Sequence, residues 1–247
     1  MELLQAILLG LLQGLTEWLP ISSSGQAMLA LTNLLKIQGI EALSISFFLH
    51  LGSLSAVFIY FRKELMEILR FKSPYLRFIL YSTIATGIVG LPIYLKLENF
   101  LYGNEINKLV GISLIITGII LRFSKEGGNK DISNYEIKDA LFAGVAQGFA
   151  IIPGISRSGV TVATLLSRRF SQQEALTISF LMAAPAIIGA NVLSLSSHNI
   201  TLTSEILAGL LASLLSSLVG IKFLLEISKR LRFDLFCIFF GAIAALI

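Results

Sequence analysis

The chain has few charged residues and almost no cysteine or histidine. Only 14% of its 247 residues are charged, and it contains one cysteine, two histidines and one tryptophan. A lone Cys237 excludes an intrachain disulfide and predicts a packed thiol. Apolar side chains are abundant instead, at 55% of the residues, with a mean hydropathy of +0.83. This composition excludes a water-soluble domain and predicts an integral membrane protein.

The basic residues are distributed as in a multi-pass membrane protein. Most of the 19 lysines and arginines fall in four short stretches, within residues 62–77, 122–138, 168–169 and 222–232. Cytoplasmic loops carry such an excess, so these four loops are predicted to be cytoplasmic. The net charge of +4 is therefore explained by membrane orientation, and nucleic acid is not expected as a partner.

Between the charged loops lie apolar segments of the length that crosses a bilayer. A hydrocarbon core of about 30 Å takes roughly 20 helical residues to cross. The sequence predicts six transmembrane helices, three in each half of the chain, near residues 45–61, 78–95, 109–121, 176–194, 204–221 and 233–247.

An internal repeat precedes the crossings in each half. Residues 11–25 (LLQGLTEWLPISSSG) and 145–159 (VAQGFAIIPGISRSG) align without a gap, with a shared Gln-Gly start and Ile-Ser-x-Ser-Gly end. Each copy is a Pro/Gly/Ser-rich break in an apolar stretch. The two copies place Glu17 and Arg157 where lipid would otherwise be expected. Charges are costly at that depth, so this pair predicts a functional site.

The segments that carry the repeat are predicted to be re-entrant helical hairpins, residues 2–35 and 139–167. The flanking loops alternate across the membrane only if these segments enter and leave on the same side. With three crossings per half, the second copy is inverted relative to the first, as in many transporters. The expected fold is a single all-α membrane domain over residues 1–247, with an inverted-topology repeat of residues 1–125 and 135–247. It has six transmembrane helices plus the two hairpins, whose tips meet near the midplane.

Two opposed hairpin tips of this composition suit an anion. A break in a helix exposes backbone N–H groups at the start of the next helix, where anions bind. Arg157 adds a planar guanidinium suited to bidentate phosphate contacts. Glu17 beside phosphate oxygens calls for a cation between them, either Mg²⁺ or Ca²⁺. The residues therefore predict a site for a diphosphate with a divalent cation.

With these two motifs, GLTEWLPISSSG and PGISRSG, the chain resembles the membrane undecaprenyl-diphosphate phosphatases, also called bacitracin-resistance proteins. The resemblance covers essentially all 247 residues. It implies hydrolysis of a polyprenyl diphosphate to the monophosphate and inorganic phosphate, which recycles the lipid carrier of cell-wall assembly. It also implies a multi-pass protein of the cell membrane, surrounded by membrane lipids, with an active site facing the outer side. A homodimer is the oligomeric state to be tested.

The resemblance also assigns roles to residues. Glu17 matches the second acid of the family's Glu-x-x-x-Glu motif and would ligate the metal, Ser23 matches a serine proposed to act in catalysis, and Arg157 matches the diphosphate-binding arginine. The remaining residues expected to bind the diphosphate belong to the same two motifs: Ser22, Ser24, Gly25, Gln26, Gly154, Ser156, Ser158, Gly159 and Thr161.

The sequence departs from the family pattern at two positions. Gln13 replaces the first acid of the motif, and Gln26 replaces a histidine. His50, in the span 45–61, stands where the family typically has glutamine, which suggests that it supplies the imidazole from a neighbouring helix. Gln13 and Gln147, equivalent in the two repeats, are expected to support the hairpins.

Each assignment has a structural alternative. Glu17 could brace its hairpin, Arg157 could clamp carbonyl ends of broken helices, His50 could be a packing residue, and the serines could be turn and cap formers. Direct attack by water and a seryl-phosphate intermediate both fit the sequence. The main alternative to a hydrolase is a transporter or flippase for polyprenyl phosphate or another anion. The other alternative is an inactive relative that binds the lipid phosphate without turnover.

Overall fold

The computed structural model describes residues 1–37, 39–71, 73–101, 106–124, 127–197, 202–227 and 233–246. Within these ranges every regular element is a helix, and the one β-type pairing is an isolated bridge between Lys130 and Phe170. The predicted all-helical class is therefore confirmed. Parts of three of the four basic loops, and residue 247 of the last predicted span, lie outside the described residues.

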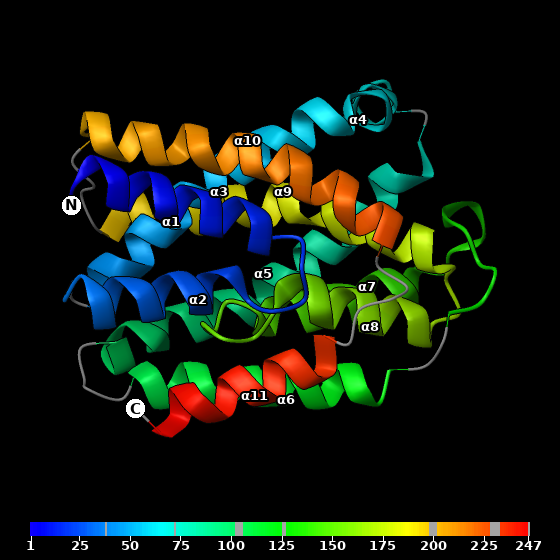
Figure 1. Ribbon diagram of the computed structural model, residues 1–247. Helices are drawn as coiled ribbons and strands as arrows, with labels where there is room; N and C mark the ends of the chain where they lie inside the picture. Colours follow the sequence, from blue (N-terminus) through cyan, green and yellow to red (C-terminus); the bar gives the residue numbers. More distant parts are fainter. Residues whose placement is uncertain are drawn as a thin grey trace.

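Each of the six predicted spans falls on a helix. These helices are α3 (Gly39–Tyr60), α5 (Pro74–Leu101), α6 (Ile106–Arg122), α9 (Gln172–Ser197), α10 (Ser204–Ile227) and α11 (Phe233–Leu246). Four of them, α3, α5, α9 and α10, are long and apolar enough to cross a membrane. The shorter α6 and α11 pack against each other along one edge of the molecule (Figure 1). The protein is therefore a multi-pass membrane protein. A short helix in the first basic loop, α4 (Arg62–Leu69), was not predicted.

The two repeat motifs each interrupt a pair of helices. In the first half, α1 (Leu3–Thr16) is followed by the break and then by α2 (Ser23–Leu29), which continues as a π-helical turn, η1 (Ala30–Leu34). In the second half, a 3₁₀ turn, η2 (Ile132–Asn134), leads into α7 (Ile137–Phe149), the break, and α8 (Arg157–Ser167). The restarts are equivalent, because the N-caps Ser22 and Ser156 each accept a hydrogen bond from the backbone N–H three residues later.

The helices pack in a way that relates the two halves. Helix α1 lies along α10, and its counterpart α7 lies along α5, so each broken segment packs on a long helix of the other half (Figure 1). Helices α3 and α9, which follow the two broken segments, pack against each other. The two breaks consequently lie in the interior, between the long helices.

Small residues allow the closest of these contacts. A Cβ built on Gly14 of α1 would lie 2.0 Å from Ser216 Oγ and 2.3 Å from the Ser213 carbonyl oxygen of α10. Ser217 Oγ donates to the Gly14 carbonyl at 3.2 Å. Glycine therefore lets the backbones of α1 and α10 approach within hydrogen-bonding range, as small residues do in membrane helix pairs.

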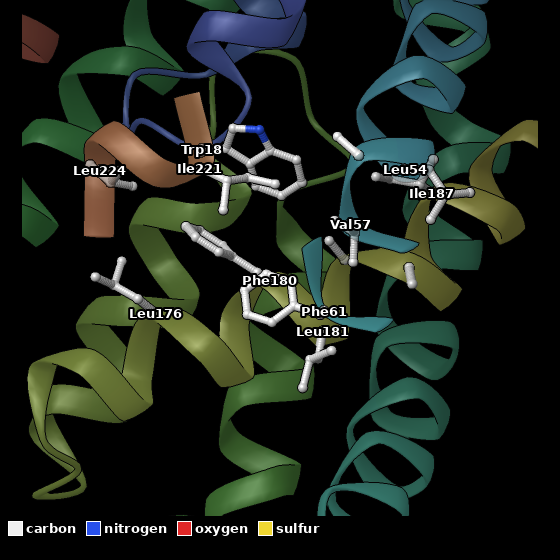
Figure 2. Packing of buried hydrophobic residues seen from close by; sticks show 13 residues of the cluster. Trp18, Leu54, Val57, Phe61, Leu176, Phe180, Leu181, Ile187, Ile221 and Leu224 are labelled. Carbon is white, nitrogen blue, oxygen red and sulfur yellow. The ribbon is translucent and has the colours of Figure 1, made fainter. Parts of the chain in front are cut away.

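The first break is anchored by an aromatic core. Trp18 is fully buried and meets Phe180 of α9 edge-on, with ring centroids 4.9 Å apart (Figure 2). Val57 of α3 and Ile221 of α10 belong to the same cluster. Because three long helices contribute side chains around Trp18, the break has a fixed position although its backbone is irregular.

A buried carboxylate connects the two ends of the second broken segment, the start of α7 and the end of α8. Asp139 of α7 forms ion pairs with Lys130 and with Arg168 at the end of α8, the latter with 2.6 Å between Nε and Oδ1. Burial opposes ionisation of Asp139, but hydrogen bonds from Lys130, the Glu136 N–H and Arg168 outweigh it and lower its pKa. The start of α7 and the end of α8 are thereby held together.

We predict opposite effects of alanine at two helix glycines. In Gly14→Ala the added methyl meets backbone of α10, so the free energy of unfolding should fall by about 1–3 kcal/mol, the usual cost of overpacking. A Cβ at Gly87 of α5 meets nothing within 4 Å, so Gly87→Ala is the matched control and should leave stability unchanged or slightly raised. Thermal unfolding of both variants in detergent measures this. Equal losses in the two variants would contradict the close α1–α10 contact.

Candidate active site

An ion pair joins the two breaks at the centre of the molecule. Arg157 Nη2, at the first residue of α8, lies 2.5 Å from Glu17 Oε1, at the end of α1. Glu17 is only 6% exposed. The two charged residues that the repeat introduced into apolar sequence are therefore partners, although 140 positions separate them.

Three polar side chains surround the second carboxylate oxygen of Glu17, Oε2. Oε2 accepts hydrogen bonds from Ser23 Oγ at 2.6 Å and Gln13 Nε2 at 2.8 Å, and it lies 3.1 Å from His50 Nε2. A buried carboxylate is stabilised only when its oxygens are paired in this manner. Gln13 thus serves as a hydrogen-bond donor to the carboxylate.

His50 reaches this cluster from the neighbouring helix α3. Its Nδ1 donates to the Ser46 carbonyl oxygen at 2.6 Å, which fixes the ring and directs Nε2 at Glu17. Ser23 Oγ lies 3.5 Å from the same Nε2. A carboxylate, a hydroxyl and an imidazole consequently meet around one point.

Arg157 is oriented by two further contacts. Its Nη1 donates to the Ser179 carbonyl of α9 at 3.1 Å, and its guanidinium lies over the Trp18 ring, 5.6 Å from the centroid. Stacking on an aromatic face and pairing with a carboxylate are both characteristic of arginine, and lysine does not reproduce the planar geometry.

Hydrogen bonds tie the two breaks to each other. Ser22 Oγ accepts from the backbone N–H of its own helix at Gly25 (3.3 Å) and from Gly154 of the other break (3.1 Å). In return, Ser158 Oγ donates to the Leu19 carbonyl at 3.0 Å. Ser22 itself has a left-handed backbone, with φ of 57°, which is uncommon for serine. The tips are therefore interlocked.

A cavity of about 220 Å³ lies beside these groups. Eight of the residues proposed from sequence line it: Glu17, Ser22, Ser23, Ser24, His50, Gln147, Ser156 and Arg157. The other seven are not among its lining residues and instead cap the restarted helices or hydrogen-bond neighbouring residues: Gln13, Gly25, Gln26, Gly154, Ser158, Gly159 and Thr161.

Sequence reasoning missed several cavity residues on the long helices. Thr83 and Thr86 of α5 and Asn191 of α9 face the cavity. Gln147 Nε2 donates to Thr86 Oγ1 at 3.1 Å, while Gln147 Oε1 is buried without a hydrogen-bond partner. The one sign of these cavity residues in the sequence is a polar side chain inside an apolar span. Such side chains also occur at helix–helix contacts that bind no ligand.

Among the described residues that line the cavity, Glu17 is the one carboxylate. No group of three or more His, Cys, Asp or Glu side chains able to hold a metal ion occurs within the described ranges. Ca²⁺ takes six to eight oxygen ligands, whereas Mg²⁺ binds through one or two carboxylates, waters and substrate phosphates. The donors present therefore fit Mg²⁺ shared with a phosphate ligand, with Glu17 and the adjacent serine oxygens as the protein's contribution.

The fold and site define a helical multi-pass membrane protein with a polar, charged centre built from two broken helices. Comparison with known proteins gives the family. The sequence profile of the bacitracin resistance protein BacA matches residues 6–246, and the chain belongs to this family.

Curated relatives match along nearly their whole length. A protein of Methanothrix thermoacetophila is 40% identical over 246 residues, which cover 98% of this chain and 96% of the relative. Proteins of Methanopyrus kandleri and Carboxydothermus hydrogenoformans are each 39% identical, over 100% and 93% of this chain and 96% and 90% of the relatives. All three are named undecaprenyl-diphosphatase.

We predict strong energetic coupling between Glu17 and Arg157. Removing one partner of a buried pair costs about 3–5 kcal/mol, because the other charge stays buried. Glu17→Gln and Arg157→Met should each lower the free energy of unfolding, and the double variant should lose clearly less than the sum. The half-exposed pair Glu136–Lys138 is the control, where Glu136→Gln with Lys138→Met should couple by less than about 1 kcal/mol.

Unfolding in detergent gives both coupling energies through a double-mutant cycle. The same small coupling in both pairs would show that Glu17 and Arg157 do not depend on each other.

Proposed function

We propose that this protein hydrolyses undecaprenyl diphosphate to undecaprenyl monophosphate and inorganic phosphate, thereby recycling the lipid carrier. The observation that carries the proposal is the cavity, which is lined by Arg157, Glu17 and four serines and otherwise mainly by apolar residues. Such a cavity matches a ligand with an anionic head and an apolar tail. Three relatives named for this activity align over nearly the whole chain.

Arg157 would hold the diphosphate. Its guanidinium lies at the cavity and starts helix α8, so the charge and the N–H groups of the first turn act on the same place. Phosphoryl transfer depends mostly on positioning and charge neutralisation. As the diphosphate head group enters, it would replace Glu17 as the ion-pair partner of Arg157.

Glu17 would then accept a proton. Ser23 Oγ already donates to Oε2 at 2.6 Å, so transfer of this proton would leave the serine oxygen free to attack the terminal phosphorus. The lipid monophosphate would leave, and water would release phosphate from the serine. His50, fixed by Ser46 and 3.1 Å from the same oxygen, would keep the carboxylate in place.

Mg²⁺ is proposed as the cofactor, held by Glu17 and the serine oxygens together with phosphate oxygens. It would neutralise developing charge on the phosphate.

In the membrane, we propose the inverted-repeat arrangement of residues 1–125 and 135–247, with six crossings, re-entrant hairpins at 2–35 and 139–167, and cytoplasmic basic loops. Support comes from the equivalent capping by Ser22 and Ser156 and from the matched packing of α1 on α10 and α7 on α5. The site would open to the outer side of the cell membrane. The transport alternative has no comparable support, since the relatives are named for a hydrolase.

The purified protein in detergent with Mg²⁺ should release phosphate from undecaprenyl diphosphate. Arg157→Ala should lower kcat/KM by about 10²–10³, as expected when a group that stabilises transition-state charge is lost. Arg77→Ala, at an exposed arginine of α5, is the matched control and should retain activity. No release by the folded wild-type protein would refute the proposal.

Ser23 and Ser24 provide a matched pair for the attacking group. Ser23→Ala should abolish a phosphoserine trapped by acid quench of a single turnover, while Ser24→Ala, whose hydroxyl lies 3.5 Å from Ser22 Oγ, should retain it. Turnover by Ser23→Ala at a rate near that of the wild type would mean that water attacks directly.

A further inference from the structure

Two buried polar atoms at the cavity have no hydrogen-bond partner. They are Thr83 Oγ1 of α5 and Gln147 Oε1 of α7, and both residues line the cavity. Gln147 is only 3% exposed. Leaving a buried polar atom unpaired is costly, so native proteins rarely keep one without a bound molecule. The two atoms therefore point to a ligand position on this wall of the cavity.

The side-chain amide of Gln147 is oriented by Thr86. Its Nε2 donates to Thr86 Oγ1 at 3.1 Å. The Thr86 hydroxyl has one proton, which it directs at the carbonyl oxygens of Ser82 and Gly144, at 2.8 and 3.0 Å. Reversing the amide would therefore place two acceptors, Oε1 and Oγ1, against each other. Gln147 Oε1 is consequently the atom that is left for a ligand.

The internal repeat relates Gln147 to Arg157. Gln147 precedes Arg157 by ten residues, as Gln13 precedes Ser23, and Gln13 Nε2 lies 3.4 Å from Ser23 Oγ. Gln147 and Arg157 both line the cavity, whose volume of about 220 Å³ is less than the roughly 300–1,000 Å³ of pockets that enclose a drug-sized ligand. A diphosphate held by Arg157 would fill most of this space, so a small molecule bound to Gln147 would contact it.

The unpaired acceptor selects the chemistry of this small molecule. A phosphate oxygen without a proton does not bind Gln147 Oε1, because both atoms are acceptors. Mg²⁺ binds through carboxylates and phosphate oxygens, and Thr83, Thr86 and Gln147 supply neither. Water donates to an amide oxygen and exchanges a hydrogen bond with a hydroxyl, and buried waters typically make about three such bonds. Water is thus the ligand that matches both unpaired atoms.

We infer that Gln147 Oε1 and Thr83 Oγ1 bind and orient the water that releases phosphate from Ser23. The inference rests on the proposed function, because it assigns the water of that reaction. The water oxygen forms a bond to phosphorus while the bond from phosphorus to Ser23 Oγ breaks. Glu17 returns its proton to the serine oxygen, and both protons of the water leave with the phosphate. Gln147 and Thr83 are therefore positioning residues for the second step.

Substitution of the two residues tests this role. Thr83→Val removes the hydroxyl and keeps the shape of the side chain, and Gln147→Met removes the acceptor at similar length. Each should lower kcat for undecaprenyl diphosphate by about tenfold, the effect of losing one hydrogen bond to the reacting water. KM should stay within about twofold, because Arg157 still holds the diphosphate. The trapped phosphoserine should increase, since its formation needs no water.

Two further variants are the controls. Thr83→Ser keeps a hydroxyl and should retain most of the activity. Thr164→Val removes a hydroxyl that donates to the Val160 carbonyl of its own helix at 2.7 Å, and it should keep the wild-type kcat. Unchanged kcat in Thr83→Val and Gln147→Met, equal losses in Thr164→Val, or less phosphoserine together with lower kcat would overturn the inference.

Competition with methanol gives a readout that a loss of folded protein would not change. Methanol can attack in place of water, so that its oxygen bonds to phosphorus and methyl phosphate is released. The ratio of methyl phosphate to inorganic phosphate should rise severalfold in Thr83→Val and Gln147→Met, because an apolar side chain accommodates the methyl group and no longer selects water. Thr164→Val should keep the wild-type ratio.

The two proposals fail in different ways. Phosphate release by the wild-type protein, with the same kcat and the same product ratio in Thr83→Val and Gln147→Met, would refute the water position alone. No phosphate release from undecaprenyl diphosphate by the folded wild-type protein would refute the proposed hydrolysis and the water position with it.

Discussion

The ion pair between Glu17 and Arg157 is the interaction on which the rest of the structure depends. Each charge interrupts an apolar segment inside the protein, where an unpaired charge is costly, and the two lie 2.5 Å apart. The surrounding contacts serve this pair: Ser23, Gln13 and His50 surround one oxygen of Glu17, while Trp18 and the Ser179 carbonyl orient Arg157. Two irregular breaks therefore become one rigid site.

The same pair connects stability with chemistry. In the absence of a substrate, Arg157 neutralises Glu17. A diphosphate offers Arg157 more negative charge than a carboxylate does, so binding would separate the pair and leave Glu17 to accept a proton or contact Mg²⁺. The interlocking hydrogen bonds from Ser22 to Gly154 and from Ser158 to Leu19 would keep the breaks in register during this exchange.

The sequence predicted the elements well and the contacts between them poorly. Hydropathy located six helices, four of which are long and apolar enough to cross a membrane, and Pro, Gly and Ser at the two motifs located the breaks within a few residues. Position in sequence could not show that Ser158 and Thr161 turn away from the cavity, since both lie on the first turns of α8. Nor could it distinguish a glycine that permits a close helix contact, such as Gly14, from one such as Gly87 whose Cβ would meet nothing within 4 Å.

The most direct test of the account is an experimental structure with a lipid analogue whose bridging diphosphate oxygen is replaced by methylene, so that it cannot be hydrolysed. The account predicts that the guanidinium of Arg157 contacts the phosphonate oxygens and no longer pairs with Glu17, while Ser23 Oγ faces the terminal phosphorus. An intact Glu17–Arg157 pair, with the phosphonates bound elsewhere, would contradict it.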